Sequence, residues 1–182
     1  MTTRNPTPRT ESEEGATVFI GLGANLGDAR ATLRDALIAL QGLATPGSLR
    51  ASALYGSAPV DSSGPDYVNA VACLRTALAP HALLDALQAI EQRFGRDRPY
   101  RNAPRTLDLD VLLFGVEADA GGLVIDDDRL SVPHPRAAQR TFVLEPLAEL
   151  WPNGAIPGAG RVADLLVVAR RDPAQRVERL KP

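Results

Sequence analysis

The chain has 182 residues, of which 45% are hydrophobic and 23% charged, and its formal net charge is −2. That length suits one domain with a substantial core, and the balance of charge gives no general attraction to nucleic acid or to an anionic membrane surface. No apolar run approaches the ~20 residues of a membrane-spanning helix, and the single cysteine, Cys73, cannot form an internal disulfide, so we expect a cytoplasmic protein.

The N-terminal segment, residues 1–16, is polar and lacks the apolar stretch of a secretory signal. We expect a disordered tail there, followed by one domain over residues 17–182. Residues 17–23 predict a first strand. A helix follows, because Asp28 can cap its N-terminus and apolar residues then recur at helical spacing until Gly42.

Two more strands and a second helix come next. The pattern predicts strands over residues 49–55 and 67–78, with a loop over residues 58–65 that is dense in turn residues. Pro80 opens the second helix at a position where proline is tolerated. The apolar stripe of that helix ends before Gly95.

A fourth strand and two C-terminal helices complete the predicted order. The strand covers residues 106–114, a short hairpin strand covers residues 123–125, and the helices cover residues 142–150 and 162–169. The order β-α-β-β-α-β is typical of a ferredoxin-like α+β sandwich, whose helices cover one face of a four-stranded antiparallel sheet. We therefore expect that fold with extra C-terminal helices, and with the other sheet face open for a site.

Two acidic residues, Asp108 and Asp110, alternate with leucines on the predicted fourth strand. Alternate residues of a strand share a face, so both carboxylates point the same way, about 7 Å apart at Cα. Hard oxygen ligands on one surface suit magnesium, which also binds substrate phosphates, and two such ions can clamp a phosphoryl displacement. A solvated acidic face on an amphipathic strand is the alternative.

The segment before that strand is rich in arginine: residues 93–105 contain five arginines and one acidic residue. A planar guanidinium binds phosphate through two parallel hydrogen bonds, so this loop beside a carboxylate pair is what a metal–triphosphate complex needs. Solvated arginines, or salt bridges to nearby acids, are the alternative. The only lysine is Lys181, which excludes a phosphate-loop lysine and a protein-kinase strand lysine.

Other polar residues are candidates for contacting a nucleotide. Gln88 and Glu91 lie three apart on the second helix, where they could hydrogen-bond an adenine or a ribose, or simply be surface groups. His134 lies between two prolines that stiffen its backbone, and Arg140 follows it. Both could contact phosphate oxygens, although an ordinary rigid turn would also explain His134.

Tyr67, Asn69 and Phe142 are candidates for a flat pocket. Tyr67 and Asn69 share a strand face by the same alternation. An aromatic pair can sandwich a planar ring, and an asparagine amide offers a donor and an acceptor to an aminopyrimidinone edge. The alternative places both aromatic residues in the core.

The glycines of residues 21–27 invite a dinucleotide-binding interpretation, which the spacing excludes. The pattern G-x-G-x-x-x-G is one residue too long, and residues 41–50 contain no acid where a ribose-binding residue should fall. We therefore interpret these glycines as serving a tight turn.

Several motifs, in this order, resemble a known family. Residues 101–112 (RNAPRTLDLDVL) resemble the hallmark of 6-hydroxymethyl-7,8-dihydropterin pyrophosphokinase (HPPK), an enzyme of folate biosynthesis. The resemblance extends from the G-x-N-L-G segment around Asn25 to about Pro152. It includes residues 65–70 (PDYVNA) and 132–136 (VPHPR).

The resemblance implies a ferredoxin-like fold and transfer of a diphosphate group from ATP to 6-hydroxymethyl-7,8-dihydropterin, with release of AMP. It implies two Mg²⁺ ions at Asp108 and Asp110. The implied catalytic residues are Arg96, Arg105, Asp108 and Asp110. The implied ATP contacts are Gln88, Glu91, Arg98, Arg105, His134 and Arg140. The implied pterin contacts are Ser57, Val60, Tyr67, Asn69 and Phe142.

The sequence departs from the family pattern in two loops. Asn102 and Ala103 replace an aromatic residue and a glycine that relatives often carry, and Tyr100 is available as a substitute ring. Residues 56–58 (GSA) replace an Arg-Thr-Pro-like stretch. We expect these differences to affect loop closure and substrate affinity more than the metal site.

Two other functions stay open from the sequence. A nucleotidyl transferase resembling a polymerase palm also uses strand carboxylates and two metals, but it binds a nucleic-acid template, which the net charge of −2 disfavours. A ferredoxin-like binding or regulatory module would bind a ligand without releasing AMP. We expect a monomer with small-molecule substrates and with neither nucleic acid nor membrane as a partner.

Overall fold

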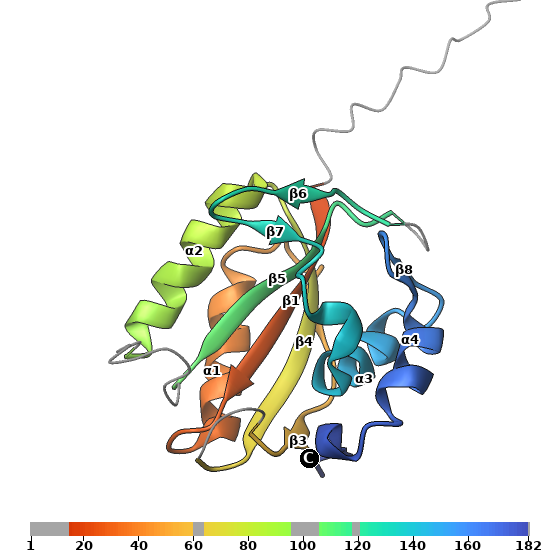
Figure 1. Ribbon diagram of the computed structural model, residues 1–182. Helices are drawn as coiled ribbons and strands as arrows, with labels where there is room; N and C mark the ends of the chain where they lie inside the picture. Colours follow the sequence, from red (N-terminus) through yellow and green to blue (C-terminus); the bar gives the residue numbers. More distant parts are fainter. Residues whose placement is uncertain (1–14, 60–63, 96–105, 118–120, 182) are drawn as a thin grey trace, which may run out of the picture.

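The computed structural model describes residues 15–59, 64–95, 106–117 and 121–181. Its centre is an antiparallel sheet with helices on both sides (Figure 1). The strands of this sheet are β1 (Ala16–Ala24), β2 (Arg50–Ala51), β3 (Tyr55–Ser57), β4 (Tyr67–Thr76), β5 (Asp108–Phe114) and β10 (Val177–Arg179). Their order is β10-β3-β4-β1-β5, and β2 also pairs with β4. The predicted α+β ferredoxin-like arrangement is confirmed, with β10 as an additional edge strand.

The predicted second strand is wrong as a single element. It is divided into β2 and β3, which both pair with β4. Ser52 lies between them, and its hydroxyl oxygen accepts a hydrogen bond from the Val71 backbone N–H at 3.0 Å. A side chain thus satisfies a β4 donor that a strand carbonyl would otherwise satisfy, and the ladder is interrupted there.

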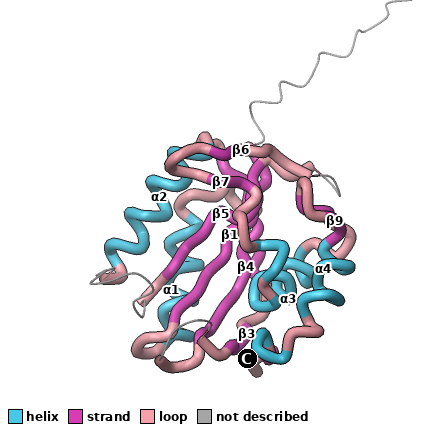
Figure 2. Tube along the Cα trace, viewed as in Figure 1, coloured by secondary structure: helices cyan, strands magenta, loops and turns pink. Residues whose placement is uncertain are grey.

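Helices α1 (Ala29–Gln41) and α2 (Pro80–Arg93) cover one face of the sheet (Figure 2). The Asp28 side chain caps α1 by accepting the Ala31 N–H at 3.0 Å, and Gly42 ends that helix. Both predicted boundaries are therefore confirmed. Leucines of α1 and α2 form one apolar cluster with β1, β4 and β5.

The opposite face is only partly open, which corrects the prediction that it would be free. Helices α3 (Thr141–Leu150) and α4 (Val162–Ala169) form a second apolar cluster with Phe19, Val71 and Leu112 of the sheet. Phe19 stacks on Trp151, with ring centroids 5.4 Å apart. The near-continuous apolar runs of β1 and β4 explain the difference, because such runs are typical of strands buried on both faces.

Short elements complete the chain. They are the hairpin strands β6 (Ile125–Asp126) and β7 (Ser131–Val132), the pair β8 (Ala155–Ile156) and β9 (Gly160–Arg161), and the 3-10 helices η2 (Ala137–Gln139) and η3 (Pro173–Gln175). The predicted hairpin strand thus begins two residues later than expected. The β6–β7 hairpin contacts α2 through His81 and Asp127, 2.9 Å apart, and through Arg129 and Asp85.

Within the described residues, no helix has the length and apolar character needed to cross a bilayer.

Candidate active site

One of the two predicted metal-binding acids lies in the same transverse row of the sheet as the predicted pterin residue Asn69. Asp108 is opposite Gly23 of β1, and Gly23 is opposite Asn69 of β4. Directly opposite residues of antiparallel strands share a face, so Asp108 and Asn69 are on one side of the sheet, about 10 Å apart across two strand spacings. Asp110 shares that face in the next row, opposite Gly21. Both acids are half-buried.

The leucines that alternate with the acids point to the other side, as predicted. Leu107 and Leu109 are 1% and 4% exposed and belong to the cluster under α1 and α2. The alternation therefore separates the strand into a core face and an acidic face.

The glycines of β1 do not serve the tight turn that the sequence suggested. Gly21 and Gly23 are inside the strand, and only Gly27 adopts the positive φ of a turn, +60°. A Cβ at Gly23 would lie 3.5 Å from the amide oxygen of Asn69. Gly23 thus leaves no side chain of β1 between Asn69 and Asp108, and we name this side-chain-free position the trough. At Gly21 the Leu112 side chain fills the space, 3.3 Å from where a Cβ would lie. The close approach of a ligand to a strand is one reason for a glycine at position 23.

The predicted pterin residues of β3 and β4 are in contact. Asn69 is 5% exposed, and its amide nitrogen donates to the Ser57 hydroxyl at 2.9 Å and to the Tyr55 carbonyl at 3.3 Å. These bonds orient the amide so that its oxygen lies on the side of Gly23. Tyr67 is opposite Ser57 in the β3–β4 register and is half-buried.

The predicted phosphate and ring contacts of the C-terminal half meet at the start of α3. The Arg140 guanidinium lies over the Phe142 ring, 5.3 Å from its centroid, which is a cation–π contact. The His134 backbone N–H donates to the Leu112 carbonyl at 2.9 Å, which holds this segment against β5.

The charges of Arg140 and Asp108 both act on the imidazole ring of His134. Burial lowers the pKa of His134, the charge of Arg140 lowers it further, and the charge of Asp108 opposes both effects. Its Nδ1 accepts the Arg136 backbone N–H at 3.2 Å. The neutral ring therefore carries its hydrogen on Nε2, where it can donate to an anionic oxygen.

The two candidates on α2 differ in their surroundings. Gln88 is exposed, whereas Glu91 is 1% exposed, and its Oε1 accepts the Leu109 backbone N–H at 2.9 Å. Leu109 lies between the two acids, so Glu91 supports the strand that carries them. Val60, Arg96, Arg98 and Arg105, the remaining predicted site residues, lie outside the described residues.

The donor set fits magnesium bound together with a phosphate ligand. Two half-buried carboxylates on one strand face supply hard oxygen ligands, and magnesium usually takes one or two carboxylates, water and substrate phosphates. Among the described residues there is no group of three or more metal-binding side chains.

The comparisons with known proteins decide the family. Residues 19–152 match the model of the family described as 7,8-dihydro-6-hydroxymethylpterin-pyrophosphokinase (HPPK). The chain belongs to this family. A 2-amino-4-hydroxy-6-hydroxymethyldihydropteridine pyrophosphokinase of Pseudomonas aeruginosa is 43% identical, over 90% of this chain and 96% of the relative. The enzyme of the same name from Pseudomonas putida is 50% identical over 64% of this chain and 92% of the relative.

Solved structures agree on the HPPK fold. The chain is similar to a Plasmodium falciparum HPPK-DHPS triple mutant with pteroate, with a TM-score of 0.66 and 13% identity. It is also similar to the wild-type P. falciparum HPPK-DHPS with SDX-DHP, with a TM-score of 0.65 and 14% identity. The chain spans less than half of these solved chains, 47% and 45%. At such identities the likeness shows the fold alone.

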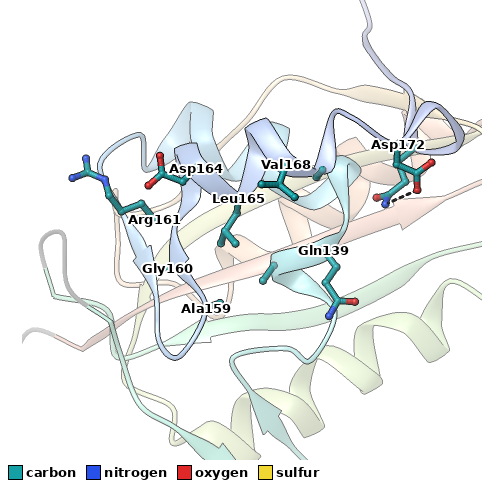
Figure 3. Close-up of a pocket in the computed structure, with 11 residues that line it drawn as sticks. Gln139, Ala159, Gly160, Arg161, Asp164, Leu165, Val168 and Asp172 are labelled. Atoms are coloured by element: carbon teal, nitrogen blue, oxygen red, sulfur yellow. Dashed lines mark hydrogen bonds between the residues drawn. The ribbon is translucent and has the colours of Figure 1, made fainter.

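A separate hollow of about 520 Å³ lies beside α4 (Figure 3). It is lined by residues of η2, the β8–β9 hairpin, α4 and η3, among them Gln139, Arg161, Asp164, Leu165 and Val168. None of the predicted site residues lines it, so we assign it no part in the reaction.

Proposed function

We propose that the protein transfers the terminal diphosphate of ATP to 6-hydroxymethyl-7,8-dihydropterin at the trough between Asn69 and the two acids. The observation that carries this proposal is the register Asn69–Gly23–Asp108. It places a group that can recognise a pterin edge and a group that can hold metal-bound phosphate on the same face. Gly23 of the central strand β1, which has no side chain, lies between them, and they are about two strand spacings apart.

The pterin binds on the Asn69 side of the trough. The Asn69 amide oxygen accepts hydrogen bonds from the ring edge, because the amide nitrogen is held by β3. Tyr67 and Phe142 stack on the ring, and Ser57 and Val60 line the same pocket. This arrangement points the hydroxymethyl group toward Asp108.

The triphosphate binds on the acid side of the trough. His134, through Nε2–H, and Arg140 donate to phosphate oxygens, and Arg98 and Arg105 add guanidinium groups from the preceding loop. Gln88 and Glu91 contact the nucleoside, and Arg96 supports catalysis. The pterin hydroxyl oxygen attacks the β-phosphorus in line and its proton passes to water. The bond from the β-phosphorus to the α–β bridging oxygen breaks, and that oxygen leaves with AMP.

Asp108 and Asp110 hold two Mg²⁺ ions in this proposal. When bound, these ions supply neutralisation of the phosphate charge and a fixed geometry for attack. The two carboxylates hold that charge on a rigid strand, which the Leu109 hydrogen bond to Glu91 supports. Positioning and electrostatics thus provide most of the expected rate increase.

The decisive experiment is product analysis with ATP, magnesium and the pterin alcohol. We expect equimolar AMP and pterin diphosphate. Formation of ADP would indicate transfer of a single phosphoryl group, release of pyrophosphate would indicate a nucleotidyl transferase, and ligand binding without any product would indicate a binding module. Each of these three results would contradict the proposal.

The same proposal includes a monomeric, cytoplasmic enzyme that acts on small molecules without nucleic acid or membrane. Sedimentation of the purified protein at assay concentration tests the monomer. A dimer whose dissociation abolishes AMP release would contradict it.

A further inference from the structure

The carboxylate of Glu149 connects α3, which carries Phe142, to β3, which carries Ser57. Glu149 lies near the C-terminal end of α3, the helix whose second residue is Phe142. Its Oε2 accepts the Tyr55 hydroxyl at 2.9 Å, and its two oxygens accept the Ala53 backbone N–H at 3.1 and 3.2 Å. The carboxylate thus joins α3 to β3 and to the residue pair before it.

These contacts add to the pairing of β3 with β4 and β10. β3 has three residues, Tyr55–Ser57, far fewer than β4 beside it. Yet two of its atoms, the Tyr55 carbonyl and the Ser57 hydroxyl, accept the Asn69 amide N–H groups. A shift of β3 would therefore release the amide whose orientation the pterin edge requires.

The Tyr55 hydroxyl is a dependable donor to this carboxylate. Tyr55 is 8% exposed. Burial, followed by the hydrogen bond to Glu149, raises the pKa of Tyr55 to about 12. The phenol therefore stays protonated across the working pH range. Removal of Glu149 would leave the part-buried Tyr55 hydroxyl and the exposed Ala53 N–H to find other acceptors, and β3 would lose its link to α3.

The outer edge of β3 is covered by the C-terminal strand. Val177 and Arg179 of β10 are opposite Ser57 and Tyr55, and Figure 1 places the C-terminus beside β3. Arg179 also reaches Glu149, with 3.6 Å between Nη2 and Oε1. The family match ends at residue 152, so β10 lies beyond the part of the chain that defines the family.

We propose that Glu149 is a positioning residue for pterin binding, which acts through Tyr55 and β3 to hold the Asn69 amide in its binding orientation. The inference rests on the proposed function, because it assumes that the pterin binds at Asn69. According to this inference, the contacts that join α3, β3 and β10 determine the affinity for the pterin and not the rate of the chemical step.

The test compares Glu149→Ala with a matched control on the same helix. Glu145→Ala removes a carboxylate of α3 that accepts two hydrogen bonds from Arg170, the residue after α4, at 2.7 and 2.8 Å. The charge of Glu145 acts on Tyr55 more weakly than that of Glu149. We expect Glu149→Ala to raise the KM for the pterin about tenfold, as loss of a hydrogen bond to a charged group would. The KM for ATP should be unchanged, and Glu145→Ala should leave both values unchanged.

Two further variants separate positioning from general destabilisation. Glu149→Gln keeps an acceptor and should restore most of the pterin affinity. Tyr55→Phe keeps the ring and removes only the hydroxyl, so it should raise the pterin KM in the same direction, and it decides the question if Glu149→Ala does not fold. An unchanged pterin KM in a folded Glu149→Ala protein, or an equal rise for both substrates, would overturn the inference.

Direct binding distinguishes this inference from the proposed function. The dissociation constant of the pterin is measured by its fluorescence, with magnesium and a non-hydrolysable ATP analogue present. A natural protein that binds the pterin but releases no AMP contradicts the proposed function alone. A pterin dissociation constant that is the same in the natural protein and in Glu149→Ala contradicts the inference alone.

Discussion

The two faces of the central sheet come from the same strands but differ in composition along their length. On the face under α1 and α2, β1 and β5 are apolar and β4 is apolar except at Thr76, with Ile20, Ala70 and Leu109 all at most 4% exposed. The face toward α3 is apolar only where α3 and α4 cover it, and becomes polar at Asn69 and Asp108. The site therefore begins where the second apolar layer ends, on strands that the first layer holds rigid. This arrangement puts reactive groups on elements more precise than loops.

The largest expected effect comes from the polar part of that second face. Asp110→Ala should reduce the rate of AMP release by about 10³-fold, because charge stabilisation at the transferred group is lost. The fold should survive, since the half-buried carboxylate faces away from the apolar cluster under α1 and α2. Asp128→Ala, at an exposed acid of the β6–β7 turn, is the control and should be fully active. Normal turnover in Asp110→Ala would remove the functional distinction between the two faces.

A side chain in the trough should have the next largest effect. Gly23→Val adds a β-branched residue that a strand accepts, but it places methyl groups between Asn69 and Asp108. We expect kcat/KM for the pterin to fall about 100-fold, as for a misplacement of about 1 Å, with a small change in melting temperature. A folded Gly23→Val protein with the same kcat and KM values as the unsubstituted protein would show that the substrates do not bind across β1.

A large-to-small substitution on the face under α1 and α2 should lower stability and leave activity per folded molecule unchanged. Leu40 of α1 is fully buried in the cluster under α1 and α2. Leu40→Ala should lower the free energy of unfolding by about 2–5 kcal/mol and leave kcat and both KM values per folded molecule unchanged. Urea denaturation and AMP release measure the two quantities. A selective change in the KM of one substrate would indicate that the two faces are coupled.

The smallest effect is a pH dependence at the edge of the polar face. The pKa of Tyr55 is raised from 10.0 to about 12, first by burial and then by Glu149. A raised pKa means that the fold favours the protonated phenol, so this stabilisation is complete below pH 10 and is lost as pH rises toward 12. An absorbance titration should show one late-titrating tyrosine, which Tyr55→Phe removes. A natural protein without a late tyrosine would contradict the burial of this hydroxyl against Glu149.

Local rules predicted the regular part of the fold. The alternation of Asp108 and Asp110 with leucines gave the correct faces of β5, and Asp28 and Gly42 gave the ends of α1, because each signal depends on neighbouring residues alone. The second apolar layer was missed although the run in β1 is apolar on both faces. The sequence pattern predicts a buried strand but does not say which helices cover it.

The candidate site residues could be named from the sequence, but the strand register that brings them together could not. The acids, Asn69 and His134 are recognisable from motifs, whereas the position of Gly23 between Asn69 and Asp108 depends on strand pairing over long sequence separations. The same holds for Glu149, which meets Tyr55 only after α3 and β3 pack together. Contacts of this kind arise from tertiary structure and leave no periodic signal in the chain.

The central claim is that the acid pair on β5 binds metal ions together with the triphosphate. The most direct test is a Mn²⁺ titration, followed by electron paramagnetic resonance, with a non-hydrolysable ATP analogue present. We predict two ions per chain for the natural protein and loss of tight metal binding in Asp110→Asn, with weak binding when the nucleotide is absent. The same metal stoichiometry and affinity in Asp110→Asn as in the natural protein would contradict the account.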